Sequence, residues 1–328
     1  MTYAQKLEDL KDDPIWEKLE KDKPCKDKTV YTASFLKQIQ RCEFAADLEF
    51  NKLAIPQSRN IQGCRGTIVH AAINTLHRFK KWDDWGDLYD QEWAKEMADP
   101  DEGHLPWSNK NLTEKDIETI EKDGAIMLGQ YVERNRDAII IGSEVPFRMI
   151  LEHPRTGTRY RFSGTADQLR ETALEHSIYP WDNKTSAQVP DKTALYWDPQ
   201  FTLYGLACAK GVWLIDGEEY EIGTYPDQLV WYHIHHLLPY KKAGKRSDGS
   251  KYVKGDLRGD PIVPVPRTMQ QYETFQDDVF RTVQKIRMGI LTRQPDSIKC
   301  SMCRHSHACA TGQYAQHESL ADVVSMEV

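Results

Sequence analysis

Residues 137–238 constrain the fold most, because their sequence is typical of three successive strands, a helix and a fourth strand. The apolar segments at residues 137–151 and 158–169 are typical of strands, and the EHPRTGT between them is typical of a hairpin turn. A third strand is expected in HSIYPWDNKTS, a helix in DPQFTLYGLACAKGV, and a further strand in DQLVWYHIHHLL. This order predicts an α/β fold in which helices flank a central mixed sheet.

Helical patterns lie on both sides of these strands. A first helix is expected from Ser34, because apolar residues recur at spacings of four, three and four, at Phe35, Ile39, Cys42 and Ala46. A long helix is expected from Thr268, which forms a capping box with Gln271. Its buried face is predicted to carry Tyr272, Phe275, Val279, Val283, Ile286 and Ile290.

A second helix is expected after Gly66, followed by a helical insertion. The helix is predicted to bury Val69, Ile73, Leu76 and Phe79, and its neighbouring face carries His70, Asn74 and His77 at positions i, i+4 and i+7. Residues 81–112 are acidic and are expected to form an insertion that packs through Trp82, Trp85, Trp93 and Trp107. A helix capped by Thr113 is expected to follow this insertion.

Charge and hydropathy limit the class of protein. Residues 1–30 are expected to be an appended arm and residues 316–328 a tail, which leaves one large domain over residues 31–315. The net charge of −7 argues against a protein that coats nucleic acid through its bulk charge. No segment approaches the roughly 18 apolar residues of a membrane span, and the N-terminus does not read as an export signal, so a soluble, cytoplasmic protein is expected.

The third strand ends in a pair of opposite charges, in YPWDNKTSA. Alternate side chains of a strand share a face, so Asp182 and Lys184 are expected to point one way and Asn183 the other. Asp167 is expected at the end of the neighbouring strand. Two carboxylates there can share a hard divalent cation, and a lysine beside them can orient or deprotonate a water and offset charge on a phosphate. Alone, an Asp-x-Lys sequence is usually a solvated ion pair.

Four short motifs in a fixed order change that interpretation. They are GTIVH ending at His70, GTAD ending at Asp167, DNK at residues 182–184, and QFTLY, which carries Gln200 and Tyr204 one helical turn apart. In this order they resemble the RecB-like branch of the PD-(D/E)XK nucleases. The resemblance covers roughly residues 34–309 and implies a restriction-endonuclease-like fold.

The resemblance also implies a role for each matching residue. His70, Asp167, Asp182 and the backbone carbonyl of Asn183 would bind Mg²⁺ or Mn²⁺, and Lys184 would serve the water. Gln200 and Tyr204 would help to hold the site and the DNA backbone. His77 and Glu144 are weaker candidates, expected to be a structural histidine and a surface charge.

The cysteine spacing indicates a second metal site. Cys300-x2-Cys303-x5-Cys309 is a strong metal signal, because two cysteines two residues apart can bind one ion, and His305 or His307 could complete a zinc site. The resemblance implies a [4Fe-4S] cluster instead, as in the CRISPR-associated exonucleases and the AddB-type recombination subunits. Cys42 would then be the upstream ligand, and the cluster would join the N- and C-terminal helices. Cys25 and Cys64 are competing upstream ligands, and Cys208 is expected to be a small buried residue.

Residues 241–258 are the most basic stretch of this acidic chain. Their basic residues are Lys241, Lys242, Lys245, Arg246, Lys251, Lys254 and Arg258. The stretch is a candidate for contact with a DNA backbone, and a solvated flexible loop is the alternative. Trp181 is a candidate for stacking on bases, with burial in the core as the alternative.

The function that the resemblance implies is that of a metal-dependent deoxyribonuclease in recombination, repair or DNA processing. It would be an exonuclease that acts on DNA ends or single strands. Two alternatives remain: an endonuclease of the same fold, and a catalytically idle iron-sulfur or zinc module that binds nucleic acid.

Overall fold

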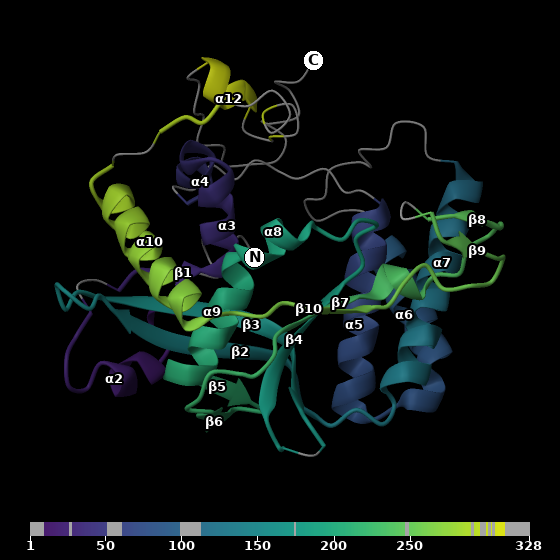
Figure 1. Ribbon diagram of the computed structural model, residues 1–328, viewed down its shortest axis with the longest axis horizontal. Helices are drawn as coiled ribbons and strands as arrows, with labels where there is room; N and C mark the ends of the chain where they lie inside the picture. Colours follow the sequence, from purple (N-terminus) through teal and green to yellow (C-terminus); the bar gives the residue numbers. More distant parts are fainter. Residues whose placement is uncertain are drawn as a thin grey trace.

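An eight-stranded mixed sheet forms the centre of the molecule (Figure 1). This computed structural model describes residues 10–25, 28–50, 61–98, 113–173, 175–246, 249–289, 292–295, 300, 303 and 306–311. The strand order is β10-β7-β4-β3-β2-β5-β6, with β1 paired to β3. The strands are β1 (Val30–Thr32), β2 (Ile140–Glu152), β3 (Arg159–Glu171), β4 (Ile178–Lys184), β5 (Gly211–Ile215), β6 (Glu218–Tyr220), β7 (Val230–His233) and β10 (Ile262–Pro264).

Helices flank this sheet, so the predicted α/β architecture is confirmed. In Figure 1, α5, α6 and α7 stand beside one end of the sheet, while α3, α9 and α10 lie towards the other end. The helices are α2 (Ile15–Leu19), α3 (Ala33–Arg41), α4 (Glu43–Phe50), α5 (Ile61–Phe79), α6 (Trp85–Ala98), α7 (Glu114–Asn135), α8 (Lys192–Tyr196), α9 (Pro199–Lys210), α10 (Met269–Arg287) and α12 (Ser306–Thr311). The described residues also form two short 3-10 helices, η1 (Trp82–Asp84) and η2 (Ile234–Leu237), and a separate pair of short strands, β8 (Gly244–Lys245) and β9 (Lys251–Tyr252).

The predicted hairpin between β2 and β3 sets the register of the sheet. His153 N donates to Thr158 O at 2.8 Å, and Gly157 adopts φ +62° in the turn, a backbone conformation that favours glycine. The antiparallel pairs keep one register from Glu152 with Arg159 at the turn to Gly142 with Leu169, and the register shifts before Ile140 pairs with Arg170. Between the turn and Gly142, the position of each residue on β3 therefore follows from that of its partner on β2.

The opposite edge of β3 is shared by two different strands. β1 pairs with residues 161–163, and β4 pairs with residues 168–171. Along residues 164–167 this edge pairs with neither of these two strands. β4 leaves β3 after Trp181 and continues beside β7 as far as Lys184. The sheet therefore opens between β3 and β4 at Asp182.

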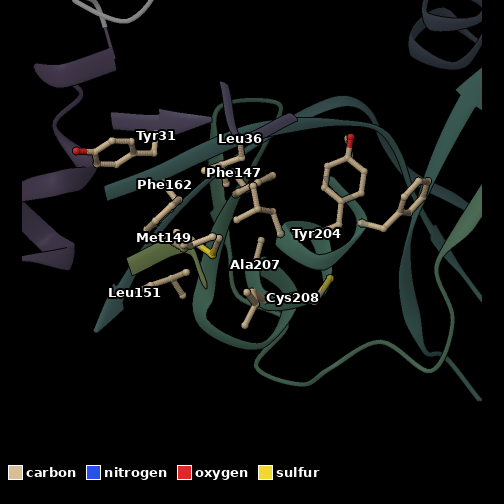
Figure 2. Close-up of a cluster of buried hydrophobic side chains, with 14 of the residues drawn as sticks. Tyr31, Leu36, Phe147, Met149, Leu151, Phe162, Tyr204, Ala207 and Cys208 are labelled. Atoms are coloured by element: carbon tan, nitrogen blue, oxygen red, sulfur yellow. The ribbon is translucent and has the colours of Figure 1, made fainter. Parts of the chain in front are cut away.

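One core cluster fills the space between the sheet and α3, α9 and α10. Figure 2 shows side chains of β1, β2, β3, α3 and α9 in this cluster, with Tyr31, Leu36, Phe147, Met149, Leu151, Phe162, Tyr204, Ala207 and Cys208 labelled. A methyl group at Gly164 would lie 2.6 Å from a ring carbon of Phe147, so glycine permits this close packing. The predicted α10 is present with its Thr268–Gln271 capping box, and it buries Tyr272, Val279 and Val283.

A second cluster lies between α5, α6 and α7 and the strands β4 and β7. Of the predicted buried stripe of α5, Val69, Ile73 and Leu76 are buried. Trp93 is buried in this cluster, and Trp82 and Trp85 pack against it. Trp107 and Ile290 lie outside the described residues.

A third, smaller cluster holds α2 on the sheet. Trp16 is 1% exposed and packs with Ile15, Val30 and Val212. Asp13 accepts a hydrogen bond from Arg148 Nε at 2.9 Å, and Glu20 pairs with Arg161. The described part of the expected N-terminal arm, residues 10–25, therefore packs on the sheet rather than extending from it.

Several element boundaries differ from the sequence prediction. The helix expected from Ser34 is broken at Cys42, whose extended backbone (φ −165°, ψ 116°) separates α3 from α4. Helix α5 begins at Ile61, before Gly66, and Phe79 at its last position is 59% exposed rather than buried. The strand expected in residues 227–238 ends at His233, because the chain turns there into η2. None of the described helices is long and apolar enough to cross a membrane.

A buried polar network joins α5 and α7 to β3. The Tyr131 hydroxyl accepts hydrogen bonds from Gln168 Nε2 at 2.7 Å and from Arg170 Nη2 at 3.1 Å. Its own proton is therefore free to bind His77 Nε2, which lies 2.7 Å away. Burial, assisted by the positive charge of Arg170, lowers the pKa of His77 to about 3. His77 is thus a neutral structural acceptor, as predicted.

This network predicts a loss of stability in acid. His77 stays neutral in the folded state and gains a proton near pH 6.5 in the unfolded state, so its contribution is present above pH 6.5 and falls as the pH drops towards 3. Between pH 7 and pH 5, this effect of His77 should lower the free energy of unfolding by about 2 kcal/mol. In urea unfolding at both pH values, His77→Gln should remove that part of the pH dependence. His176 is exposed, so His176→Gln should keep the pH dependence of the wild type. If the free energy of unfolding changes equally with pH in wild type and His77→Gln, His77 is not a buried neutral acceptor.

Candidate active site

Asp182 lies where β4 leaves β3, and it is completely buried. Its Oδ1 accepts a hydrogen bond from Gln200 Nε2 at 2.9 Å and lies 3.3 Å from the Tyr204 hydroxyl. Gln200 Nε2 is also 2.6 Å from that hydroxyl, which lies 2.8 Å from Thr165 O, so its one proton is shared between Thr165 O and Asp182 Oδ1. The predicted spacing of Gln200 and Tyr204 by one helical turn is thus used to hold a single carboxylate oxygen.

The other oxygen of Asp182 faces Lys184. Oδ2 is in ion contact with the Lys184 ammonium but accepts no well-aligned hydrogen bond from the described residues. Burial alone would lower the pKa of Lys184, but the Asp182 and Asp167 carboxylates outweigh burial and hold that pKa above its ordinary value. Lys184 is therefore a cation in the metal-free protein. A buried carboxylate oxygen with an incomplete set of partners is a candidate ligand for a cation.

Asn183 points to the opposite side, as strand alternation predicts. Its Oδ1 accepts a hydrogen bond from Trp181 Nε1 at 3.1 Å. Trp181 is buried, lies 4.7 Å from the Tyr232 ring between centroids, and is stacked by Arg170. The proposal that Trp181 stacks on bases is therefore wrong, because its ring is buried in the core.

Asp167 closes the opening between the strands. Its Oδ2 accepts a hydrogen bond from the backbone N–H of Asn183 at 2.6 Å and lies 3.5 Å from His70 Nδ1. Burial and the neighbouring charge of Asp182 raise the pKa of Asp167 to about 6, against the opposing effects of His70 and Lys184. Two acids forced together in a poorly hydrated site repel each other, and a bound cation relieves this repulsion.

Glu144 is a third acid in this group. One carboxylate oxygen of Glu144, one of Asp167 and one ring nitrogen of His70 all lie within 4.8 Å of one another. Burial of the carboxyl group and the charges of Asp167 and Asp182 raise the pKa of Glu144 to about 7. Glu144 is exposed as a residue, as expected of a surface charge, and its nearness to Asp167 and His70 also keeps it a candidate further acid of the site.

The signal for Glu144 was present in the hairpin register. Pairs Ser143 with Gln168 and Val145 with Ala166 place residue 144 opposite Asp167. Glu144 adopts φ +51°, a conformation that costs a non-glycine residue about 1 kcal/mol and is concentrated at functional sites. Counting along the strands from the predicted turn would have placed this acid beside Asp167.

Helix α5 approaches the site closely enough to deliver His70. A methyl group at Gly66 would lie 2.7 Å from Thr185 Oγ1, in the residue that follows Lys184. Glycine at this position therefore allows α5 to contact the end of β4. His70, one helical turn further on, then reaches Asp167.

Lys37 of α3 supports the site and was not predicted. Its Nζ donates to Gln200 Oε1 at 2.7 Å and lies 3.0 Å from Asp198 Oδ2. Asp198 in turn caps α9 by accepting from Gln200 N. Lys37 thereby fixes which way the Gln200 amide faces, so that Nε2 donates to Asp182.

The donor set fits a hard divalent cation. The imidazole of His70 and the carboxylates of Asp167 and Glu144 gather into one group, with Asp182 outside it, and these are ligand types that Mg²⁺ and Mn²⁺ accept in proteins. The incompletely satisfied Oδ2 of Asp182 and the raised pKa values of Asp167 and Glu144 fit the same ion.

The cysteines are not gathered into such a group. In the described part of the chain, the one group of three or more potential ligand side chains is His70, Glu144 and Asp167, which contains no cysteine. Cys42, Cys303 and Cys309 are half-buried and Cys300 is exposed. Cys64 and Cys208 are buried, the latter in the core as predicted. His305 and the side chain of His307 lie outside the description.

The basic stretch forms a small ribbon. Strands β8 (Gly244–Lys245) and β9 (Lys251–Tyr252) pair within it, and residues 247–248 lie outside the description. The rings of Tyr240 and Tyr252 stack 3.5 Å apart between centroids, and Arg246 lies over both. The exposed lysines of this ribbon are Lys241, Lys242, Lys245, Lys251 and Lys254, whereas Arg258 is directed inwards to His235 Nε2 at 2.8 Å.

The sequence matches a known protein family. A family model described as the PD-(D/E)XK nuclease superfamily matches residues 31–310. A solved structure titled "Crystal structure of SSO0001" is 12% identical, with a TM-score of 0.29, and the match covers 84% of this chain and 97% of that chain. No curated protein matches the sequence.

The crowded carboxylates predict that Mn²⁺ stabilises the fold. The ion would offset the repulsion between Asp167, Asp182 and Glu144, and at one hundred times its Kd a ligand of the folded state adds about 2.7 kcal/mol. Thermal unfolding followed by circular dichroism measures the shift in Tm. Asp182→Asn should abolish the shift and Glu144→Gln should reduce it, whereas Glu218→Gln on the exposed strand β6 should preserve it. A shift that Asp182→Asn leaves intact would place the ion elsewhere.

Proposed function

Because this chain belongs to the PD-(D/E)XK nuclease superfamily, we propose that it is a Mg²⁺- or Mn²⁺-dependent deoxyribonuclease. We further propose that it acts as an exonuclease on DNA ends or single strands, in recombination, repair or DNA processing. The observation that carries this proposal is the environment of Asp182, a fully buried carboxylate held by Gln200 and Tyr204 on one oxygen and faced by Lys184 on the other. Such an arrangement is costly to bury and has a chemical use only if a cation and a phosphate enter the site.

Each residue of the site has a distinct task in this proposal. A bound Mg²⁺ or Mn²⁺ would polarise the scissile phosphate and make an attacking water more acidic. His70, Asp167, Asp182 and the backbone carbonyl of Asn183 are the groups that would hold it, with Glu144 as an additional carboxylate. Gln200 and Tyr204 fix the orientation of Asp182, and Lys37 fixes that of Gln200.

Lys184 acts in this proposal as a hydrogen-bond donor. Its pKa is raised by the two carboxylates, so it keeps its proton at neutral pH before the metal binds. An ammonium group beside Asp182 can orient a water through its lone pair, or offset the negative charge that builds on the phosphate oxygens. The buried surroundings strengthen both effects, because the local dielectric constant is lower than that of water.

A time course on DNA tests this function. Asp182→Ala and Lys184→Ala should each lower Mn²⁺-dependent degradation at least about a hundredfold, because each removes a charge that acts in the transition state. Lys115→Ala, an exposed lysine on α7, is the matched control, and circular dichroism checks folding. Undiminished activity of either site variant would refute the assignment.

The form of the DNA substrate separates the alternatives in the same experiment. An exonuclease shortens end-labelled linear and single-stranded DNA and spares covalently closed circles. An endonuclease of the same fold cuts the circles as well. A catalytically idle module that binds nucleic acid degrades none of these substrates.

We also propose that Cys42, Cys300, Cys303 and Cys309 hold a [4Fe-4S] cluster that clasps the two ends of the domain. Contacts beside Cys42 support this. Glu43 accepts hydrogen bonds from Lys285 Nζ at 2.9 Å, at the end of α10, and from Thr292 Oγ1 at 2.8 Å. Arg293 lies over the Phe44 ring. Residues 292 and 293, ahead of Cys300 in the sequence, thus contact the start of α4 beside Cys42.

The competing upstream cysteines have less suitable surroundings. Burial, assisted by the charge of Glu20, raises the pKa of the Cys25 thiol to about 12, which disfavours the thiolate that metals require. Cys64 is buried within α5.

Metal analysis of anaerobically purified protein tests the cluster. About four iron and four sulfide per chain, with a brown colour, are expected. Cys42→Ser should lose both, whereas Cys25→Ser should keep them. A colourless protein with one zinc would replace the cluster by a zinc site, and iron retained in Cys42→Ser would remove Cys42 from the ligand set.

The ribbon of residues 241–258 is proposed to contact the DNA backbone. Its five exposed lysines project from a short hairpin that Tyr240, Arg246 and Tyr252 stiffen by stacking. Contacts of lysine with phosphate give affinity without sequence preference and make binding depend on salt.

A further inference from the structure

Two neighbouring aromatic rings are exposed in the short segment that leads into α9, the helix that carries Gln200. Trp197 is 54% exposed and Tyr196 is 42% exposed, and their ring centroids lie 5.1 Å apart in an edge-to-face arrangement. They end helix α8 and immediately precede Asp198, which caps α9 and is bridged to Gln200 by Lys37. The segment with the exposed rings is therefore connected to Gln200, which holds Asp182, through the contacts of Lys37 with Asp198 and Gln200.

The two rings also line an open groove. Its volume is about 370 Å³, and its walls come from α3, the α8–α9 segment and α10. Leu36, Phe275 and Val279 supply apolar surface. The lining cations Arg281 and Lys285 are paired, Arg281 with Asp278 of the same groove and Lys285 with Glu43. A ligand with flat apolar faces matches the aromatic and apolar part of this lining.

The aromatic segment is held rigidly by buried polar contacts. Arg267 Nη2 donates to Leu195 O at 2.8 Å and to Asp198 O at 3.1 Å. Gln271 Nε2 donates to Tyr196 O at 3.2 Å, and Asp191 caps α8 through Ala194 N at 2.9 Å. A surface that is already ordered loses little conformational entropy when a ligand binds, so the rings are pre-organised for contact.

We propose that Tyr196, Trp197 and the groove form a stacking platform for unpaired nucleobases of the DNA strand that enters the active site. This inference rests on the proposed nuclease function and adds a strand preference to it. Every base offers a π face, so stacking on an aromatic ring tolerates any sequence. Bases inside a duplex are stacked on one another and offer no free face to a protein ring. The platform therefore selects single strands.

Binding of matched single-stranded and duplex oligonucleotides tests the platform. The Lys184→Ala protein is used as the background, so that DNA is not consumed, and fluorescence anisotropy gives the affinities. Trp197→Ala should weaken binding of oligothymidylate roughly tenfold or more and leave a blunt hairpin duplex unaffected. Trp197→Phe should retain most of the affinity, because it keeps an aromatic face. Phe79→Ala, which removes an exposed ring at the end of α5, should change neither affinity.

The lysine ribbon supplies a second comparison. Lys251→Ala combined with Lys254→Ala should weaken single-strand and duplex binding alike and flatten the salt dependence, because phosphates are present in both. Trp197→Ala should leave the salt dependence unchanged. The two kinds of contact are therefore separated by their salt response as well as by their strand preference.

Three results would overturn the platform: unchanged single-strand affinity in Trp197→Ala, an equal loss for single strand and duplex, or no single-strand binding by the background protein. In the first case the groove holds another occupant, such as a protein segment. The nuclease proposal is judged separately, by degradation in the wild type. Degradation with unchanged binding in Trp197→Ala removes the platform alone, whereas Trp197-dependent binding without degradation removes the nuclease function alone.

Discussion

The hydrogen bond from the backbone N–H of Asn183 to the Asp167 carboxylate holds the candidate active site together. It spans the point at which β4 leaves β3 and pairs with β7 instead. A buried N–H group needs a partner, and here a carboxylate takes the place of the missing strand. The same bond brings Asp167 beside Asp182, so the opening of the sheet creates the pair of acids.

The rest of the site compensates for placing these charges together. Gln200, Tyr204 and Lys184 hold Asp182, while His70 faces Asp167. The compensation is incomplete, because the pKa values of Asp167 and Glu144 remain raised to about 6 and about 7. A site that retains protons in this way has a surplus of negative charge for a cation to offset. The fold holds these groups in place. Lys37 fixes the orientation of Gln200, and glycine at position 66 lets α5 approach the end of β4.

The periodicity of strands and helices made several neighbours in the candidate site predictable from the sequence. Asp182 and Lys184 share a face because they are two residues apart on a strand, and Gln200 and Tyr204 meet because they are four apart on a helix. Glu144 was only a weaker candidate because its position opposite Asp167 depends on the hairpin register, which the turn fixes but which spacing alone does not display. Lys37 carried no signal, since its partner Gln200 lies 163 residues away. Trp181 and Trp197 show the same limit: a tryptophan at a strand end and one at a helix end read alike in sequence, yet one is buried and the other is 54% exposed.

Crystals of the protein grown with Mn²⁺ and examined by anomalous diffraction at the manganese edge would locate the ion in the site. The geometry predicts a single strong peak at the opening between β3 and β4, in contact with His70, Asp167 and Asp182 and beside the backbone carbonyl of Asn183. Lys184 should lie next to this peak without binding the ion. A peak at any other position, or none at saturating Mn²⁺, would contradict the assignment of this opening as a metal-dependent nuclease site.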